Sequence, residues 1–329
     1  MQQAYEVALS YLQDHLESTV YERISYFDSM IKSFKYTSQK STLHKHQLNH
    51  SIAIKLSENS ADFDGGNCVF LTHKLNSSLP GYLRPNMIKS KVLKKHYQEG
   101  FPRFCHSATL IKCSNGYLLL DSGYGLSRPI KLELDGSKDS YQMGKHVWKY
   151  SLNKKHRKII WEVFTLDGEF VESTYYRLKC AGSHIKIHNE ISTQAALADR
   201  KLTAVFRDRD GFKTANIKID LLKKNIKITQ MWQDVPVTLI PFSELEHLDL
   251  NAKIRILKQY FDPEFCKRVR IEQHKFTRMI AFVIDNYNFI EDKILPTPTN
   301  RRQKIMTPLA RLPKKWLPSV SLKLQRARA

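Results

Sequence analysis

Between residues 85 and 205 the sequence breaks into short apolar segments, and this feature most limits the folds open to the chain. The segments lie at 107–111, 117–120, 130–134, 158–164 and 184–188, separated by clusters of Gly, Asn, Asp or Ser. Short strands bounded by turn residues at this spacing are typical of antiparallel sheets. The pattern therefore predicts an antiparallel barrel or sandwich in the middle of the chain.

Helical patterns lie on both sides of this region. In residues 1–60 apolar side chains recur at steps of three and four, so we expect helices there. Residues 200–290 combine strands with two short helices. The strands are expected at 202–206, 212–219, 226–230 and 237–240, and the helices at 251–261 and 263–270. The fold class that follows is α+β.

Composition is that of a globular protein with an unusual positive charge. Apolar residues make up 42% and charged residues 26% of the 329 residues, while the net charge is +21. The last 37 residues, 293–329, hold ten Lys or Arg, no Asp or Glu, and five Pro, which prevent a long helix. We expect a partly docked tail that binds an acidic surface or a phosphate-bearing partner such as nucleic acid, acidic lipid or a phosphorylated cofactor.

Cysteine usage and targeting signals point to a reducing compartment. The five cysteines are odd in number and irregularly spaced, which does not suit a disulfide framework. The first residues lack a basic segment followed by an apolar one, and no apolar stretch reaches the roughly 20 residues of a membrane span. We expect a cytoplasmic protein with no transmembrane segment, and export by a signal of another kind stays open.

Two groups of histidines invite a metal interpretation, which the sequence does not favour. His44, His46 and His50 have Lys, Gln and Asn as neighbours, without Cys or carboxylate. His184 and His188 share one face of a predicted strand but lack a third ligand. The expectation is that no metal is bound.

Cys68 follows a Gly-Gly pair at the predicted start of a helix. Unpaired amides and the positive end of the helix dipole stabilise a thiolate there, and the same amides could face a developing oxyanion. Gly65 and Gly66 allow a substrate to approach the backbone closely. Gly65, Gly66 and Asn67 are therefore expected to contact substrate. Taken alone, the pattern also fits a buried structural thiol.

A predicted hairpin carries His106 on one strand and Asp121 on the other. A two-residue turn at 115–116 places Asp121 opposite Leu110, roughly 13 Å along the strand from His106. A four-residue loop over 112–115 sets His106 directly opposite Asp121. Both registers put the two side chains on one face, and only the second predicts a contact.

These residues together resemble a known family. Gly65-Gly66-Asn67-Cys68, then His106, then Asp121-Ser-Gly-Tyr-Gly is similar to the Gly-Gly-x-Cys, His and Asp-x-Gly-Phe-Gly pattern of the arylamine N-acetyltransferases, with matching intervals of 38 and 15 residues. The resemblance implies a catalytic triad: Cys68 as nucleophile, His106 as base, and Asp121 fixing the imidazole tautomer. It also implies that Tyr124 lines the acceptor pocket. Ser107, next to the histidine, is assigned to substrate binding as well.

The resemblance further implies a fold and a reaction. We expect a helical domain (1–84) carrying the nucleophile, a central antiparallel β-barrel (85–205) carrying His and Asp, a C-terminal α/β lid (206–292), and the basic tail (293–329). The donor would be acetyl-CoA or another acyl-CoA, and the acceptor a small-molecule amine. The chain departs from the family at Asp64, where an Arg is usual, and in lacking a Pro-Phe-Glu-Asn-type motif between residues 36 and 53.

Three functions remain open on the sequence. The first is an acyltransferase that works through a Cys68 acyl-enzyme. The second is a cysteine hydrolase or amidase of the papain or transglutaminase type, because the order Cys, His, Asp serves those reactions too. The third is a non-enzymatic anion-binding scaffold with the basic tail as its functional part.

Overall fold

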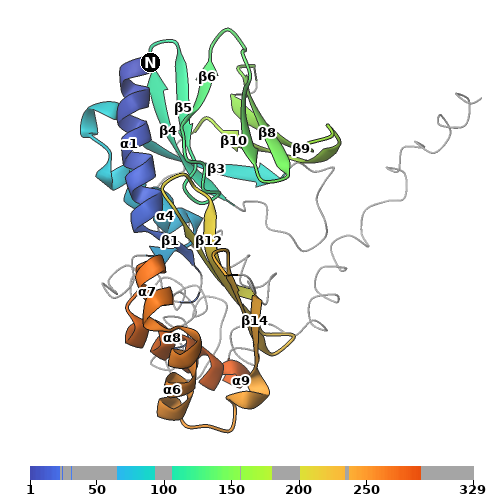
Figure 1. Ribbon diagram of the computed structural model, residues 1–329. Coiled ribbons are helices and arrows are strands. Elements are labelled where there is room, and N and C mark those ends of the chain that lie inside the picture. The colour runs from blue at the N-terminus through green and yellow to red at the C-terminus, as the bar shows by residue number, and fades with distance from the viewer. Residues whose placement is uncertain are drawn as a thin grey trace, which may run out of the picture. The chain divides into compact units, whose positions relative to one another are not determined.

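The computed structural model describes residues 1–22, 24, 31, 65–92, 106–155, 157–179, 201–233 and 237–289 (Figure 1). The basic tail, the histidines at 44, 46, 50, 184 and 188, and the strand expected at 184–188 lie outside the described residues. The chain divides into two compact units, Met1–Tyr287 and Asn288–Ala329; the elements below belong to the first, apart from the last helical turn, Tyr287–Phe289, which crosses the boundary. None of the helices in the described ranges is long and apolar enough to cross a membrane.

The first helix forms as its apolar pattern predicts. Helix α1 (Gln2–Ser18) buries Ala8, Leu12 and Leu16 on one face. That face packs against helix α4 (Cys68–Ser78) and against apolar side chains of two neighbouring strands (Figure 1). The helix ends at Thr19, whose backbone is extended, and strand β1 (Val20–Glu22) follows. The expectation that the helical pattern continues through Tyr21 is therefore wrong, because Tyr21 pairs with Val205 of a sheet.

Eight antiparallel strands form the sheet that was expected in the middle of the chain. Their order is β6-β5-β4-β3-β10-β9-β8-β7. The strands are β3 (Asn86–Val92), β4 (Ser107–Cys113), β5 (Gly116–Leu120), β6 (Ile130–Glu133), β7 (Asp139–Met143), β8 (His146–Asn153), β9 (Lys158–Thr165) and β10 (Phe170–Arg177). The predictions of β4, β5, β6 and β9 are confirmed, while the other four strands were not foreseen.

This sheet is not a closed barrel among the described strands, so that part of the predicted fold class is wrong. No ladder joins the edge strands β6 and β7. Instead, Asp139 of β7 accepts a hydrogen bond from the Lys131 amide of β6 at 2.8 Å and pairs with Arg128 at 2.9 and 3.0 Å. A carboxylate thus takes the backbone donor that strand pairing would use.

A second sheet positions the segment that leads to Cys68. Its order is β14-β13-β12-β11-β1-β2, with β1 parallel to β2 and the remaining neighbours antiparallel. The further strands are β2 (Gly65–Gly66), β11 (Lys201–Arg207), β12 (Lys213–Asp220), β13 (Asn225–Gln230) and β14 (Val237–Pro241). Because β2 pairs with β1, the residues just before Cys68 are fixed at the edge of this sheet.

The C-terminal helices follow the second sheet in sequence. The helices expected at 251–261 and 263–270 are confirmed as α6 (Leu250–Tyr260) and α7 (Pro263–Val269). Helix α8 (Gln273–Asp285), which buries Phe276, Ile280 and Ile284, was not foreseen. Short helical turns lie at Gly81–Leu83, Phe242–Glu244 and Tyr287–Phe289. The fold is α+β, with an N-terminal helix, antiparallel sheets and C-terminal helices. The division at residues 84, 205 and 292 stays a prediction.

Candidate active site

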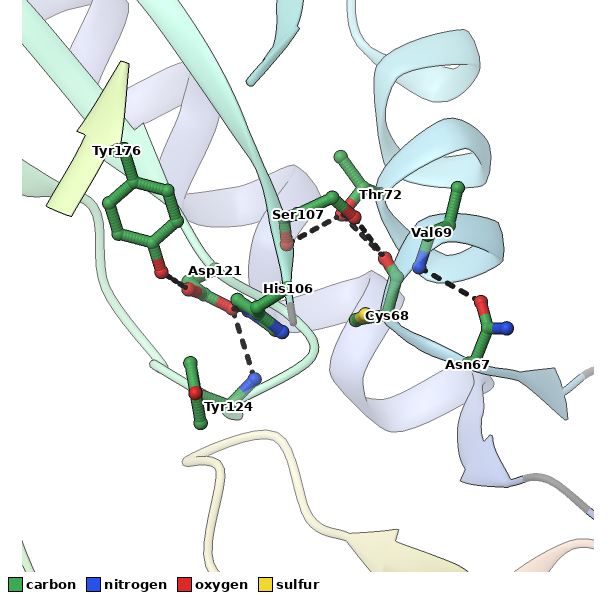
Figure 2. A network of polar contacts seen from close by, with 9 residues as sticks. All are labelled: Asn67, Cys68, Val69, Thr72, His106, Ser107, Asp121, Tyr124 and Tyr176. Atoms are coloured by element: carbon green, nitrogen blue, oxygen red, sulfur yellow. Dashed lines mark hydrogen bonds and ion pairs between the residues drawn. The ribbon is translucent and has the colours of Figure 1, made fainter. Parts of the chain in front are cut away.

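Cys68 is the first residue of helix α4, and the backbone on both sides of it is held by hydrogen bonds. The carbonyl oxygen of Cys68 accepts from the Thr72 hydroxyl at 2.6 Å and from the Ser107 hydroxyl at 3.0 Å. Ser107 begins β4, so this bond ties the helix to the strand that follows His106. Figure 2 shows the network and the Cys68 sulfur pointing toward the His106 ring.

Two amides at the helix N-terminus already have a hydrogen-bond partner. The side-chain oxygen of Asn67 accepts hydrogen bonds from the amides of Val69 at 3.0 Å and Phe70 at 3.2 Å. This is the usual arrangement of an N-cap asparagine. The expectation that unpaired amides at this end could face an oxyanion is therefore wrong for these two groups, because Asn67 already occupies them.

His106 and Asp121 are in direct contact. The distance between His106 Nε2 and Asp121 Oδ1 is 2.7 Å, and both residues are buried. A carboxylate only accepts hydrogen bonds, so Nε2 carries the proton and Nδ1 is the nitrogen left for the thiol. The two residues come from the ends of neighbouring strands, His106 directly before β4 and Asp121 directly after β5.

The observed hairpin register is neither of the two predicted ones. Cys113 pairs with Gly116 across a two-residue turn at 114–115, and Thr109 pairs with Leu120. Continuing this register places Asp121 opposite residue 108, two positions from His106. The prediction that only direct opposition permits contact is wrong, because diagonal neighbours on one face are within reach of long side chains.

Both oxygens of the Asp121 carboxylate are engaged. Oδ1 also accepts from the Tyr124 amide at 3.0 Å, and Oδ2 accepts from the Tyr176 hydroxyl at 2.6 Å. The Asp121 carbonyl oxygen accepts from the Gly125 and Leu126 amides at 3.1 and 3.0 Å, which closes a tight turn. The carboxylate that faces His106 is thus fixed by its own turn and by β10.

The charges of these groups favour a thiolate–imidazolium pair. Burial raises the pKa of the Cys68 thiol, but the charge of His106, its hydrogen bond and one from the Ser107 backbone outweigh this, so the pKa lies below its ordinary value. Burial lowers the pKa of His106, whereas the charges of Asp121 and Cys68 and hydrogen bonds to both raise it well above its ordinary value. Both shifts act in the direction of a thiolate paired with an imidazolium.

Tyr124 contacts the other side of the histidine. Its ring centroid is 4.1 Å from that of His106, and it meets the Trp148 and Trp161 rings edge-on at 4.9 and 5.5 Å. The two indoles stack on each other at 4.9 Å. Trp148 comes from β8, Trp161 from β9 and Tyr176 from β10. Sequence reasoning missed all three. A signal existed for Trp161 alone, because it lies in the predicted strand 158–164, where alternate side chains share one face.

Gly123 lies where the turn passes close to Cys68 and His106. A Cβ at this position would be 2.6 Å from His106 Cε1 and 2.8 Å from Cys68 Cβ, which is shorter than real contacts allow. The glycine of the Asp-Ser-Gly-Tyr-Gly segment is thus required by space.

The structure brings the predicted site residues together, and their roles stay predictions. Cys68, His106, Ser107, Asp121 and Tyr124 are linked by the contacts above, Asn67 caps the helix, and Gly65 and Gly66 form β2. The described residues contain no cluster of metal-ligating side chains. Cys113 and Cys266 have pKa values raised mainly by burial, that of Cys266 to about 11.

No family model matches the sequence, and no curated protein sequence matches it either. Solved structures with a similar fold are arylamine N-acetyltransferases. The enzyme of Mycobacterium smegmatis has 12% identity over 84% of this chain and 90% of that chain, with a TM-score of 0.48. The enzyme of Mycobacterium marinum, in complex with CoA, has 14% identity over 86% of this chain and 93% of that chain, with a TM-score of 0.48. The enzyme of Salmonella typhimurium has 14% identity over 85% of this chain and 91% of that chain, with a TM-score of 0.46. At identities of 12–14% and TM-scores of 0.46–0.48, these matches carry no conclusion about what this chain does.

Proposed function

We propose that the protein is a cysteine acyltransferase, in which Cys68 accepts an acyl group from a thioester such as acetyl-CoA and passes it to a small amine. The observation that carries the proposal is the buried line of Cys68, His106 and Asp121, with a lowered thiol pKa and a raised imidazole pKa. Such a pair supplies a nucleophile at neutral pH and a proton donor beside it.

In the first half-reaction the thiolate of Cys68 attacks the carbonyl carbon of the donor thioester. A carbon–sulfur bond forms to Cys68, and the bond to the donor sulfur then breaks. The departing thiolate takes the proton of the His106 imidazolium. Asp121 stabilises that imidazolium before the proton leaves, because its carboxylate lies 2.7 Å from Nε2.

In the second half-reaction an amine attacks the acyl carbon held by Cys68. Neutral His106 takes a proton from the amine nitrogen, the new carbon–nitrogen bond forms, and the bond to Cys68 sulfur breaks. The thiolate and imidazolium are restored together. No proton, electron or co-reactant is left over, so the cycle needs only the donor and the acceptor.

Transfer and hydrolysis differ only in what attacks the acyl group on Cys68. Cys68 is 3% exposed and His106 5% exposed, and this burial limits the approach of donor, amine and water alike. The cysteine hydrolase expected as an alternative uses water in place of the amine, so the fate of the acyl-enzyme separates the two functions.

The test is to incubate the full chain with acetyl-CoA and, separately, with a thiol-alkylating reagent, and to locate adducts by intact mass and peptide mapping. The proposal predicts one acetyl group on Cys68, none in Cys68→Ala, and an unchanged yield in the control Cys113→Ala. Rapid alkylation of Cys68 in mild acid without acetylation would favour the hydrolase. Neither adduct would favour the non-enzymatic scaffold.

A further inference from the structure

Arg207 ends strand β11 next to the turn that carries Asp121. The pairing of β11 with β12 shifts in register between Phe206 and Arg207, and such irregularities redirect side chains. The guanidinium lies against Gly125, where an added Cβ would collide with its Cζ and Nε atoms. Gly125 is two residues from Gly123, which approaches Cys68 and His106. One turn therefore contacts both the reacting groups and Arg207.

One donor of this arginine is buried without a partner. Nη1 donates to the Gly211 carbonyl oxygen at 2.8 Å, while Nε is buried without a partner. Among the residues that the structure describes, no carboxylate forms an ion pair with Arg207. The neighbouring Asp208 accepts from the Phe212 amide at 2.9 Å. A buried donor without a partner calls for an explanation, and a ligand group is one.

Arg207 also lines a pocket of about 120 Å³ between the end of α1, β11 and the end of α7, which Cys68, His106 and Gly125 do not line. At roughly 30 Å³ for a water molecule, it has room for about four waters or one small anion. Two other arginines line the same pocket, and both are paired: Arg270 with Glu17 and Arg268 with Glu264. Within the described part of the chain, Arg207 is thus the arginine of this pocket that lacks a carboxylate.

We propose that Arg207 forms an anion-binding subsite next to the turn that also contacts Cys68, at which the guanidinium holds a carboxylate or phosphate group of the acyl acceptor or donor. The role of the subsite in acyl transfer rests on the proposed function. The first test below does not depend on that function, because it measures only how Cys68 is alkylated. A guanidinium presents a planar fork of donors that suits either group. Burial lowers the pKa of Arg207, and the charges of Tyr141, Asp121, Asp208 and Tyr21 partly offset this. A bound anion would offset it further.

The first experiment uses two labels for Cys68 that differ only in charge, 4-(iodoacetamido)benzoate and 4-(iodoacetamido)benzamide. The rate ratio of the charged label to the neutral one is measured for the full chain, for Arg207→Gln and for Arg209→Gln. Arg209 lies on the same hairpin, is 54% exposed and pairs with Asp14, so it is the matched control. The ratio is expected to fall about tenfold or more in Arg207→Gln, the size of one charge-assisted hydrogen bond, and to change little in Arg209→Gln.

A ratio unchanged by Arg207→Gln, or lowered equally by Arg209→Gln, would overturn the subsite. General disturbance of the fold slows both labels alike and leaves the ratio unchanged. If Arg207→Gln does not fold, the unmodified protein decides: inorganic phosphate should slow the charged label and spare the neutral one. An equal effect on both labels, or none, would contradict the proposal.

The second experiment distinguishes donor from acceptor. If the subsite holds the donor's phosphates, Arg207→Gln slows Cys68 acetylation by acetyl-CoA but not by the uncharged S-acetylpantetheine. If it holds the acceptor's carboxylate, both acetylations are unchanged and transfer to 4-aminobenzoate slows relative to its methyl ester. A label ratio that depends on Arg207 in a protein that acetyl-CoA never acetylates would leave the subsite standing and reject the acyltransferase. Acetylation of Cys68 with no dependence on Arg207 in any arm would do the reverse.

Discussion

The hydroxyl of Tyr176 donates a 2.6 Å hydrogen bond to Asp121 Oδ2, on the side of the carboxylate away from His106. The two residues are 55 positions apart in the chain, and both are fully buried. Burial and the charge of Asp121 raise the pKa of Tyr176 well above its ordinary value, so the phenol stays protonated and remains a donor. The carboxylate that faces the imidazole is thus oriented from a strand that carries none of the three reacting residues.

Replacing Tyr176 by Phe should weaken both the fold and the site. The change leaves a buried carboxylate oxygen without its donor, which costs about 1–3 kcal/mol. We expect a loss of this size in the free energy of unfolding, measured by urea denaturation, and several-fold slower acetylation of Cys68. Tyr175→Phe on the same strand is the control. Equal effects of both changes would mean that the Asp121 contact has no special part.

Replacing Asp121 by Asn should keep the fold and remove most activity. The amide can hold the imidazole in the wrong tautomer, and it has no charge to stabilise an imidazolium. The same change in a serine-protease triad costs about 10⁴-fold in rate, and we expect a loss of a few orders of magnitude in steady-state turnover. Near-full turnover by Asp121→Asn would remove this residue from the triad.

Replacing Gly123 by Ala should displace the reacting groups. The new Cβ would lie 2.6 Å from His106 Cε1 and 2.8 Å from Cys68 Cβ, so the turn or the ring must move. A shift of this kind costs about 10²-fold in a positioned reaction. Gly81→Ala is the control, because a Cβ there meets nothing within 4 Å. Acetylation rates measured side by side decide the point, and equal rates in the two variants would contradict it.

The parts of the fold that the sequence predicted are those with strong local patterns. The apolar stripe of α1 and the dense apolar runs of β4, β5 and β9 need only their own residues to be recognised. Strand β7 reads Asp-Ser-Tyr-Gln-Met and is mostly polar, so its place at the edge of the sheet depends on β8 and on the Asp139 contacts with β6. Long-range pairing of this kind leaves no periodic signal.

The candidate site shows the same division. The turns beside Cys68, His106 and Asp121 mark these residues in the sequence, and their joint role as a triad is what the resemblance to the arylamine N-acetyltransferases implies. The sequence allows two hairpin registers, with turns at 115–116 or 112–115, and the observed turn at 114–115 belongs to neither. Tyr176, Trp148 and Arg207 were missed because they reach the site from strands distant in sequence. A single chain carries no local mark of such contacts.

The pH dependence of thiol alkylation tests the central claim, a thiolate at Cys68 paired with an imidazolium at His106. The lowered pKa of Cys68 keeps its thiolate as pH falls, until pH passes through that lowered value. The raised pKa of His106 keeps the imidazolium as pH rises, up to that raised value. Between the two values the ion pair persists.

Iodoacetamide labelling of the full chain, followed by peptide mapping at a series of pH values, measures the alkylation rate of each thiol in one experiment. Cys113 and Cys266 are internal references, because burial raises the pKa of both. The account predicts that Cys68 reacts rapidly well below about pH 8.5, the ordinary value for a thiol, while Cys113 reacts only in alkaline solution. If Cys68 reacts no faster than Cys113 in mild acid, Cys68 is not the nucleophile of this protein.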